Sequence, residues 1–292
     1  MKHLLTRYLL AAVVALSVTA FGVAYATGLN LELTVLVATV LALVLAMTAE
    51  RMIPFRSDWN RPHGDLATDF TSAVLLVGIV DPLLKYLAPL LVVYVYSKSA
   101  TPSGFASELP FLAQVLLSIL VIEFGSYWSH RLHHQIRPLW WLHAMHHSSQ
   151  RLYALNNFRF HPLNYTINFA VSVVPVMYFG VSSEALLAYL AITQPILMFQ
   201  HANVDLRSGI LNYVFSTNEL HRWPHSSASP EANSNYGKAI VLWDHLFGTF
   251  RYADSRNEPS NVGLFSSSSD YPGRSSYIAQ LRSMFTPACC GA

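Results

Sequence analysis

Long apolar segments separated by short polar ones dominate the first two thirds of the chain. Each is long enough, or nearly so, to cross about 30 Å of hydrocarbon as a helix. Within the third segment, Asp81 and Lys85 are four residues apart, so the two charges can pair on one helix face. The pattern predicts an all-α, polytopic membrane bundle of about six spans. The apolar segments cover about 8–28, 31–49, 70–96, 110–129, 165–180 and 184–200.

Basic residues predict how the bundle is oriented. If the N-terminus is cytoplasmic, all but two of the 18 Lys and Arg residues, Lys85 and Lys98, lie on the cytoplasmic side of the six spans. This distribution follows the positive-inside rule, and it puts the histidine clusters on the same cytoplasmic side. The first segment also resembles a signal peptide, because Lys2 and Arg7 precede an apolar core and the small-residue sequence 24–26.

Composition narrows the class of protein further. Of 292 residues, 53% are apolar and only 12% are charged, about half the charged fraction of a soluble protein. The net charge is +2 and no run of Lys and Arg could follow a phosphate backbone, which argues against a nucleic-acid partner. The adjacent pair Cys289 and Cys290 gives neither a disulfide framework nor a metal knuckle. We expect an N-terminal membrane region (1–64), a catalytic domain (65–252) and a polar tail (253–292) with a loose Ser-rich linker at 266–269.

Clustered histidines are the main candidates for chemistry. In SHRLHH and HAMHH, pairs of histidines are three or four residues apart, so their imidazoles share a helix face and can converge on a metal. Buried next to a bilayer without partners, such a cluster would be costly. His133 points away from the face that its neighbours share, which favours a non-ligand role. The candidate ligands are His130, His134, His143, His146, His147, His201, His221 and His225, with His161 as a further possibility.

For several other polar residues, an ordinary structural role is the alternative to a role at a metal site. His3, His63 and His245 each stand alone and are typical of interfacial polar residues. Glu123 lies seven residues before His130, on the same helix face, and is either an orienting partner for a ligand imidazole or an interfacial acid.

The donor set bears on which metal is bound. Imidazole suits Fe, Zn, Cu and Ni, and the absence of nearby Cys excludes a soft thiolate site. Eight or more histidines are enough for two metals, whereas a structural zinc site needs four ligands. Two metals held by neutral nitrogen at a membrane face favour oxygen activation, with zinc open as an alternative to iron.

Over about residues 65–252 the chain resembles the fatty acid hydroxylase superfamily, in the segments YWSHRLHHQIRPLWWLHAMHHSS, RFHP, QHANV, NELHRWPHS and NSNYGKAIVLWDHLFGTF. The resemblance implies a membrane helical core with a cytoplasmic histidine-rich cap that holds a non-haem di-iron site. Such enzymes use O2 and two electrons to hydroxylate or desaturate a fatty acyl, sterol or isoprenoid lipid. The family's histidine boxes fall on His130 and His134, on His143, His146 and His147, on His201, and on His221 and His225.

Two positions depart from the family pattern. Pro224 stands where relatives often have a further histidine, and Asp205 stands where some relatives have another. Asp205 could replace that ligand with a carboxylate, whereas Pro224 cannot ligate through its side chain. Asn233, Asn235 and Tyr236 match the family pattern, and we expect them to shape a loop or to act as outer partners of the ligands.

The chain contains no GxGxxG, flavin or CxxCH motif. A separate electron donor, such as a reductase, a ferredoxin or a cytochrome, is therefore implied. The alternatives are a family member that binds metal without catalysis, motivated by Pro224, and a divalent-metal transporter or sensor. The second alternative requires ionisable residues along the spans, and only Asp81 and Lys85 lie deep in a span. A bis-histidine haem protein would need its histidines inside facing spans.

Overall fold

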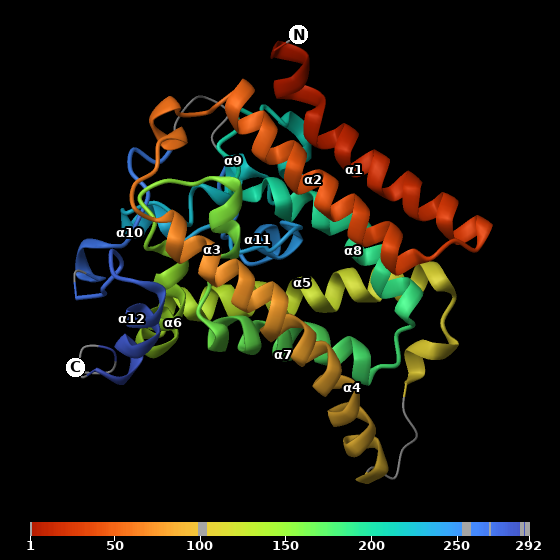
Figure 1. Ribbon diagram of the computed structural model, residues 1–292. Helices are drawn as coiled ribbons and strands as arrows, with labels where there is room; N and C mark the ends of the chain where they lie inside the picture. Colours follow the sequence, from red (N-terminus) through yellow and green to blue (C-terminus); the bar gives the residue numbers. More distant parts are fainter. Residues whose placement is uncertain (1, 99–103, 253–257, 269, 287–288, 290–292) are drawn as a thin grey trace.

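The computed structural model describes residues 2–98, 104–252, 258–268, 270–286 and 289 (Figure 1). These residues form helices and connecting loops with isolated β-bridges but no β-strand, so the predicted all-α class is confirmed. Ser269 and Cys290 lie outside the described residues. The long helices are α1 (Lys2–Thr27), α2 (Leu31–Met52), α3 (Leu66–Leu75), α4 (Asp81–Lys98), α5 (Phe111–Gln135), α6 (Arg137–His147), α7 (Pro162–Tyr178) and α8 (Ser183–Gln200), and the short ones are α9 (Asn218–His221), α10 (Ser229–Ala232), α11 (Leu242–Leu246) and α12 (Tyr277–Arg282).

Four stretches of the described chain are long and apolar enough to cross a membrane. They are α1, α2, α5 and the rod Leu66–Lys98, in which one π-helical turn, Leu76–Val80, joins α3 to α4. The other two predicted segments form α7 and α8, of 17 and 18 residues. The apolar pattern thus located every long helix except α6, and four spans are supported by length and composition.

The hairpin of α1 and α2 packs on α8 through small side chains. Ala42, Ala46 and Ala49 of α2 are buried in one cluster with residues of α1 and α8. The buried Ser17 hydroxyl of α1 donates to the carbonyl of Ala191 at 2.7 Å. Small side chains permit this close approach of the helices, as in membrane bundles generally.

A glycine sets the contact between α5 and α7, which lie side by side (Figure 1). A Cβ added at Gly125 would collide with the carbonyl oxygen of Val171. Only glycine permits the two backbones to approach this closely. The approach brings α5 and α7 together beside the histidine end of the bundle.

The two ends of the bundle differ. At one end lie the short turn between α1 and α2, the loop before α5 and the turn between α7 and α8. There Tyr25 stacks on Phe111 with ring centroids 4.9 Å apart, and the Ala106 N–H donates to the Phe179 carbonyl at 3.0 Å. The opposite end carries α6, α9 to α12 and the long loops (Figure 1). The Arg207 N–H donates to the Thr6 carbonyl at 2.7 Å, which places the start of α1 at this second end.

The C-terminal segment packs on α6 and does not form the loose linker that we expected. The indole N–H of Trp140 donates to Ser268 Oγ at 2.8 Å, and that of Trp141 donates to Ser283 Oγ at 3.0 Å. Tyr271 and Tyr277 are buried in the same cluster. The serine hydroxyls satisfy two buried indole donors, which explains why a polar segment is ordered here.

Candidate metal centre

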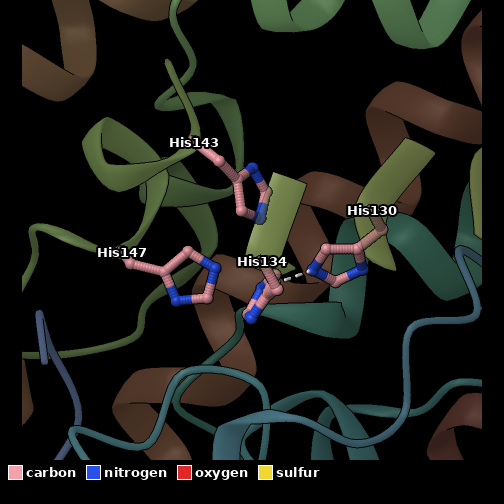
Figure 2. Close-up of side chains that lie close together, drawn as sticks. All are labelled: His130, His134, His143 and His147. Atoms are coloured by element: carbon pink, nitrogen blue, oxygen red, sulfur yellow. Dashed lines mark hydrogen bonds between the residues drawn. The ribbon is translucent and has the colours of Figure 1, made fainter. Parts of the chain in front are cut away.

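Eight buried or half-buried histidines converge in two groups of four at the loop-rich end of the bundle. In each group, four imidazole nitrogens lie within 4.8 Å of one another. Figure 2 shows how the rings of the first group face a common centre. The eight residues are those that the sequence indicated as ligands. The first group is His130, His134, His143 and His147, and the second is His146, His201, His221 and His225.

Helix α6 contributes to both groups. Its His143 and His147, four residues apart, face the pair His130 and His134 of α5, whose Nε2 atoms are 3.1 Å apart. His146, on the neighbouring face of α6, belongs to the second group. The imidazoles of His147 and His225 stack with centroids 4.2 Å apart, so the two groups adjoin.

The second group gathers residues that are distant in sequence. His201 follows the last residue of α8, and His221 ends the four-residue helix α9. The Nε2 atom of His221 lies 3.1 Å from that of His201 and 3.2 Å from that of His225. Between His221 and His225 the chain turns through Pro224, because proline disfavours helix at the residue before it.

Hydrogen bonds from the ring Nδ1 atoms fix the tautomer of four of these histidines. In each case Nδ1–H donates to a protein oxygen, which leaves the Nε2 lone pair directed into the group. Oriented lone pairs of this kind are what a metal requires. The bonds are His130 to the Tyr236 carbonyl (3.0 Å), His143 to Asn164 Oδ1 (2.9 Å), His146 to the Arg159 carbonyl (3.1 Å) and His201 to Asn156 Oδ1 (2.8 Å).

His133 lies outside both groups and is linked to His143 of the first group through hydrogen bonds to the Asn164 side chain. Its Nδ1–H donates to the Ser129 carbonyl at 2.6 Å, so its Nε2 accepts from the Asn164 side-chain amide at 3.1 Å. The same amide accepts from His143 through its oxygen. This placement agrees with the non-ligand role expected for His133.

Several ring nitrogens of the groups are buried without a hydrogen-bond partner in the described structure. They are His134 Nδ1, His143 Nε2, His221 Nδ1 and both nitrogens of His147. A buried unsatisfied nitrogen costs about 1–3 kcal/mol, so five of them together need an explanation. A donor set made only of imidazole nitrogen, with unused lone pairs, fits first-row transition metals.

Burial also keeps the α6 histidines neutral. It lowers the pKa of His143, His146 and His147, and that of His146 falls to about 3. Neighbouring imidazoles add to this effect. A metal ligand must be deprotonated, and these residues are neutral at physiological pH without any metal.

Glu123 supports the first group through a loop. Its carboxylate is buried and accepts the Ala239 and Ile240 backbone N–H groups at 2.9 and 3.0 Å, together with the Tyr189 hydroxyl at 2.8 Å. It therefore positions the segment that begins at Tyr236, whose carbonyl binds His130. Glu123 makes no direct hydrogen bond to a ligand imidazole among the bonds of the described residues.

Asp205 and Asn235 lie outside the two groups. Asp205 pairs with Arg207 at 2.8 Å, half-exposed to solvent. Asn235 has a left-handed backbone, with φ of 52°, and its side-chain amide donates to the carbonyl of Leu220, next to His221. Its side-chain oxygen accepts the Arg251 N–H at 2.7 Å. Asn235 therefore shapes the loop behind α9.

His161 caps α7 and lies outside both groups. Its Nδ1 accepts the Leu163 N–H at 3.1 Å, and burial lowers its pKa to about 4. In the unfolded chain the pKa is about 6.5, so between these values the unfolded state binds a proton that the folded state excludes. The free energy of unfolding therefore falls as the pH falls, by about 1.4 kcal/mol per pH unit from this residue.

We therefore predict that His161→Asn, which keeps a capping side chain but cannot titrate, flattens the dependence of the melting temperature on pH between pH 7 and 5. Thermal unfolding of both proteins in detergent measures this, with exposed His63→Asn as the control. An identical pH dependence in wild type and His161→Asn would contradict the assignment.

No direct sequence signal indicated the residues that orient the histidines of the two groups from outside. Asn156 and Asn164 orient His201 and His143, and the guanidinium of Arg159, buried behind His146, pairs with Asp69 of α3. Tyr153 also donates to Asp69. Their signal was a concentration of polar residues in LNNFRFHPLN between two apolar segments.

An apolar helical bundle with two four-histidine groups is typical of a membrane protein that binds metal at one end of its helices. Residues 115–249 match the fatty acid hydroxylase family. The chain is 32% identical to an ornithine lipid hydroxylase of Rhizobium tropici, over 74% of this chain and 66% of that protein. It is 29% identical to human alkylglycerol monooxygenase and 26% identical to the Xenopus tropicalis one, over 50% and 46% of this chain and 32% and 30% of theirs.

The chain belongs to the fatty acid hydroxylase superfamily. Its matches span just under two thirds of the ornithine lipid hydroxylase and about a third of the alkylglycerol monooxygenases. No solved structure gives a significant match to the chain.

The departure from the family pattern at Pro224 leads to a prediction about metal binding. Both groups have four imidazoles, and a histidine at 224 would add a donor to the turn between His221 and His225. We expect Pro224→His to retain metal more strongly than wild type in competition with a chelator. Pro224→Ala, which removes the ring without adding a donor, is the control. Equal retention by all three proteins would exclude a missing ligand at this position.

Proposed function

We propose that this protein is a membrane-bound, non-haem di-iron oxygenase that hydroxylates a lipid with O2 and external electrons. The observation that carries the proposal is the convergence of eight histidines in two adjoining groups of four. Membership of the superfamily adds the class of reaction. The named relatives are a hydroxylase and a monooxygenase, which favours hydroxylation over desaturation.

The first group would hold one iron and the second group the other. Together the two irons supply the redox chemistry needed to activate O2 for attack on an unactivated C–H bond, which no side-chain acid or base can achieve. The protein contributes fixed imidazole lone pairs and a buried environment that excludes water. Asn164, Asn156 and the carbonyl of Arg159 keep three of the rings in the required tautomer.

The topology that we propose has six spans, with α7 and α8 crossing the membrane beside the four longer stretches. The arrangement of the ends supports it, because the turn after α1, the loop before α5 and the turn after α7 share one end and the histidine groups lie at the other. Arg7, Arg51 and Arg56 also belong to the histidine end, which the positive-inside rule assigns to the cytoplasm. A separate cytoplasmic donor would deliver the electrons there.

Metal analysis and an optical spectrum of the purified full-length protein test the proposal. We expect two irons per chain and no Soret band, and O2-dependent hydroxylation when lipid extract, a reductase system and the protein are combined. Stoichiometric zinc without activity would contradict an oxygenase. The all-alanine variant of the second group is the control, and it should lose one iron and all turnover.

A further inference from the structure

An apolar groove runs between α5 and α7 on the side of the bundle next to the first histidine group. Its volume is about 230 Å³, below the range of about 300–1,000 Å³ for sites that enclose a whole small molecule. It therefore suits part of a flexible chain. Leu139 of α6 and Ile167 of α7 form its walls.

The rim of the groove faces the surroundings of the bundle. Phe124, Leu132 and Val171 line it and are 42%, 37% and 44% exposed. Phe124 and Leu132 belong to α5, which has the length and composition of a membrane span. In the proposed six-span topology, Phe124 and Val171 of this rim face lipid hydrocarbon.

The floor of the groove adjoins the candidate metal centre. It includes Ser129 and His133, which are 5% and 0% exposed. The His133 ring lies with its centroid 5.6 Å from that of His143 in the first group. A chain that entered from the rim and reached the floor would be one side chain away from that group.

The lining also indicates the chemistry of the occupant. No charged side chain lines the groove. The two nitrogens of His133 already bind the Ser129 carbonyl and the Asn164 amide, so His133 offers no vacant hydrogen bond to a polar ligand. An apolar occupant is favoured, because burying a polar group without a partner is costly.

We propose that this groove admits the hydrocarbon chain of a bilayer lipid and directs it toward the first histidine group. The inference rests on the proposed function, since it assigns the chain-binding part of the same site. Gly125 also lines the groove, and its contact with Val171 fixes how close α5 and α7 approach there.

Photolabelling tests the groove without any need for turnover. The metal-loaded protein is placed in phosphatidylcholine vesicles that contain a phosphatidylcholine with a diazirine on its acyl chain, and labelled residues are located by mass spectrometry. We expect label on Ser129 or His133. Ile122 and Ser126 of α5 are equally buried but do not line the groove, and we expect them to stay unlabelled.

Val171→Trp fills the rim and should reduce labelling of the floor by about fivefold or more, because overpacking of this size excludes an occupant. Labelling of Leu116, which is exposed on α5 away from the groove, should not change. Leu116→Trp is the matched control and should leave floor labelling intact. Metal content of both variants reports whether they fold, and Ile167→Phe narrows the groove from within if Val171→Trp is unstable.

Label confined to the rim, or floor labelling that survives Val171→Trp and Ile167→Phe, would overturn the proposal. If the floor is labelled in a protein that binds no iron and hydroxylates nothing, the result contradicts the proposed function. It still supports the groove as a site for a hydrocarbon chain. A protein that hydroxylates lipid while its floor stays unlabelled would support the function and refute the groove.

Discussion

Alanine at any one of His143, His146 or His147 is expected to remove bound metal and abolish hydroxylation while the protein stays in the membrane. Each variant deletes one of four nitrogens in a group. Loss of an outer partner of a ligand already lowers metal affinity or activity by about 10–100-fold, so loss of a ligand should exceed about 100-fold in activity. Iron content and product formation in membranes measure the effect.

His3→Ala is the control for these variants, because His3 is exposed near the start of α1 and belongs to neither group. It should match wild type in both assays. Full iron content and turnover in the three α6 variants would show that the groups are not metal sites. Loss of activity in His3→Ala would show that the groups were wrongly chosen.

Replacement of Asp69 by asparagine is expected to cause the largest loss of stability. The Asp69–Arg159 pair joins α3 to the segment behind His146, and its side chains are 0% and 2% exposed. Removing one partner of a buried pair leaves the other charge uncompensated, which typically costs about 3–5 kcal/mol. Metal content should fall as well, because the Arg159 carbonyl orients His146. Thermal unfolding in detergent and iron analysis measure the two effects.

A matched exposed pair provides the control. Arg56 and Asp58 are 3.3 Å apart, with side chains 38% and 57% exposed, so Asp58→Asn should cost less than about 1 kcal/mol. Equal destabilisation by Asp69→Asn and Asp58→Asn would mean that burial of the first pair does not matter to the fold.

Sequence pattern was sufficient to find the long helices and the eight histidines. Apolar runs and histidines at spacings of three and four residues are local signals, and both persist in the structure. The division of the histidines into two groups cannot be predicted from local sequence spacing alone. Consecutive positions on a helix differ by about 100° in direction, so His146 and His147 point to different neighbours although both are close in direction to His143.

The roles of the acidic residues also depended on tertiary contacts. Glu123 shares a helix face with His130, yet its partners are the Tyr189 hydroxyl and two backbone N–H groups of a loop more than 100 residues away in the sequence. Asp205 lies four residues after His201 but pairs with Arg207. A charged side chain interacts with whichever partner the fold brings closest, and spacing alone does not identify that partner.

The sequence separation of the ligands has a consequence for the order of assembly during synthesis. The first group is complete within 18 residues, from His130 to His147, whereas the second spans 80 residues, from His146 to His225. Closing the longer loop costs more chain entropy, and the chain must be made past His225 before the group exists. The two histidine groups therefore form in two stages. In the proposed di-iron enzyme, metal in the second group would report that the nascent chain has inserted and folded through its last histidine.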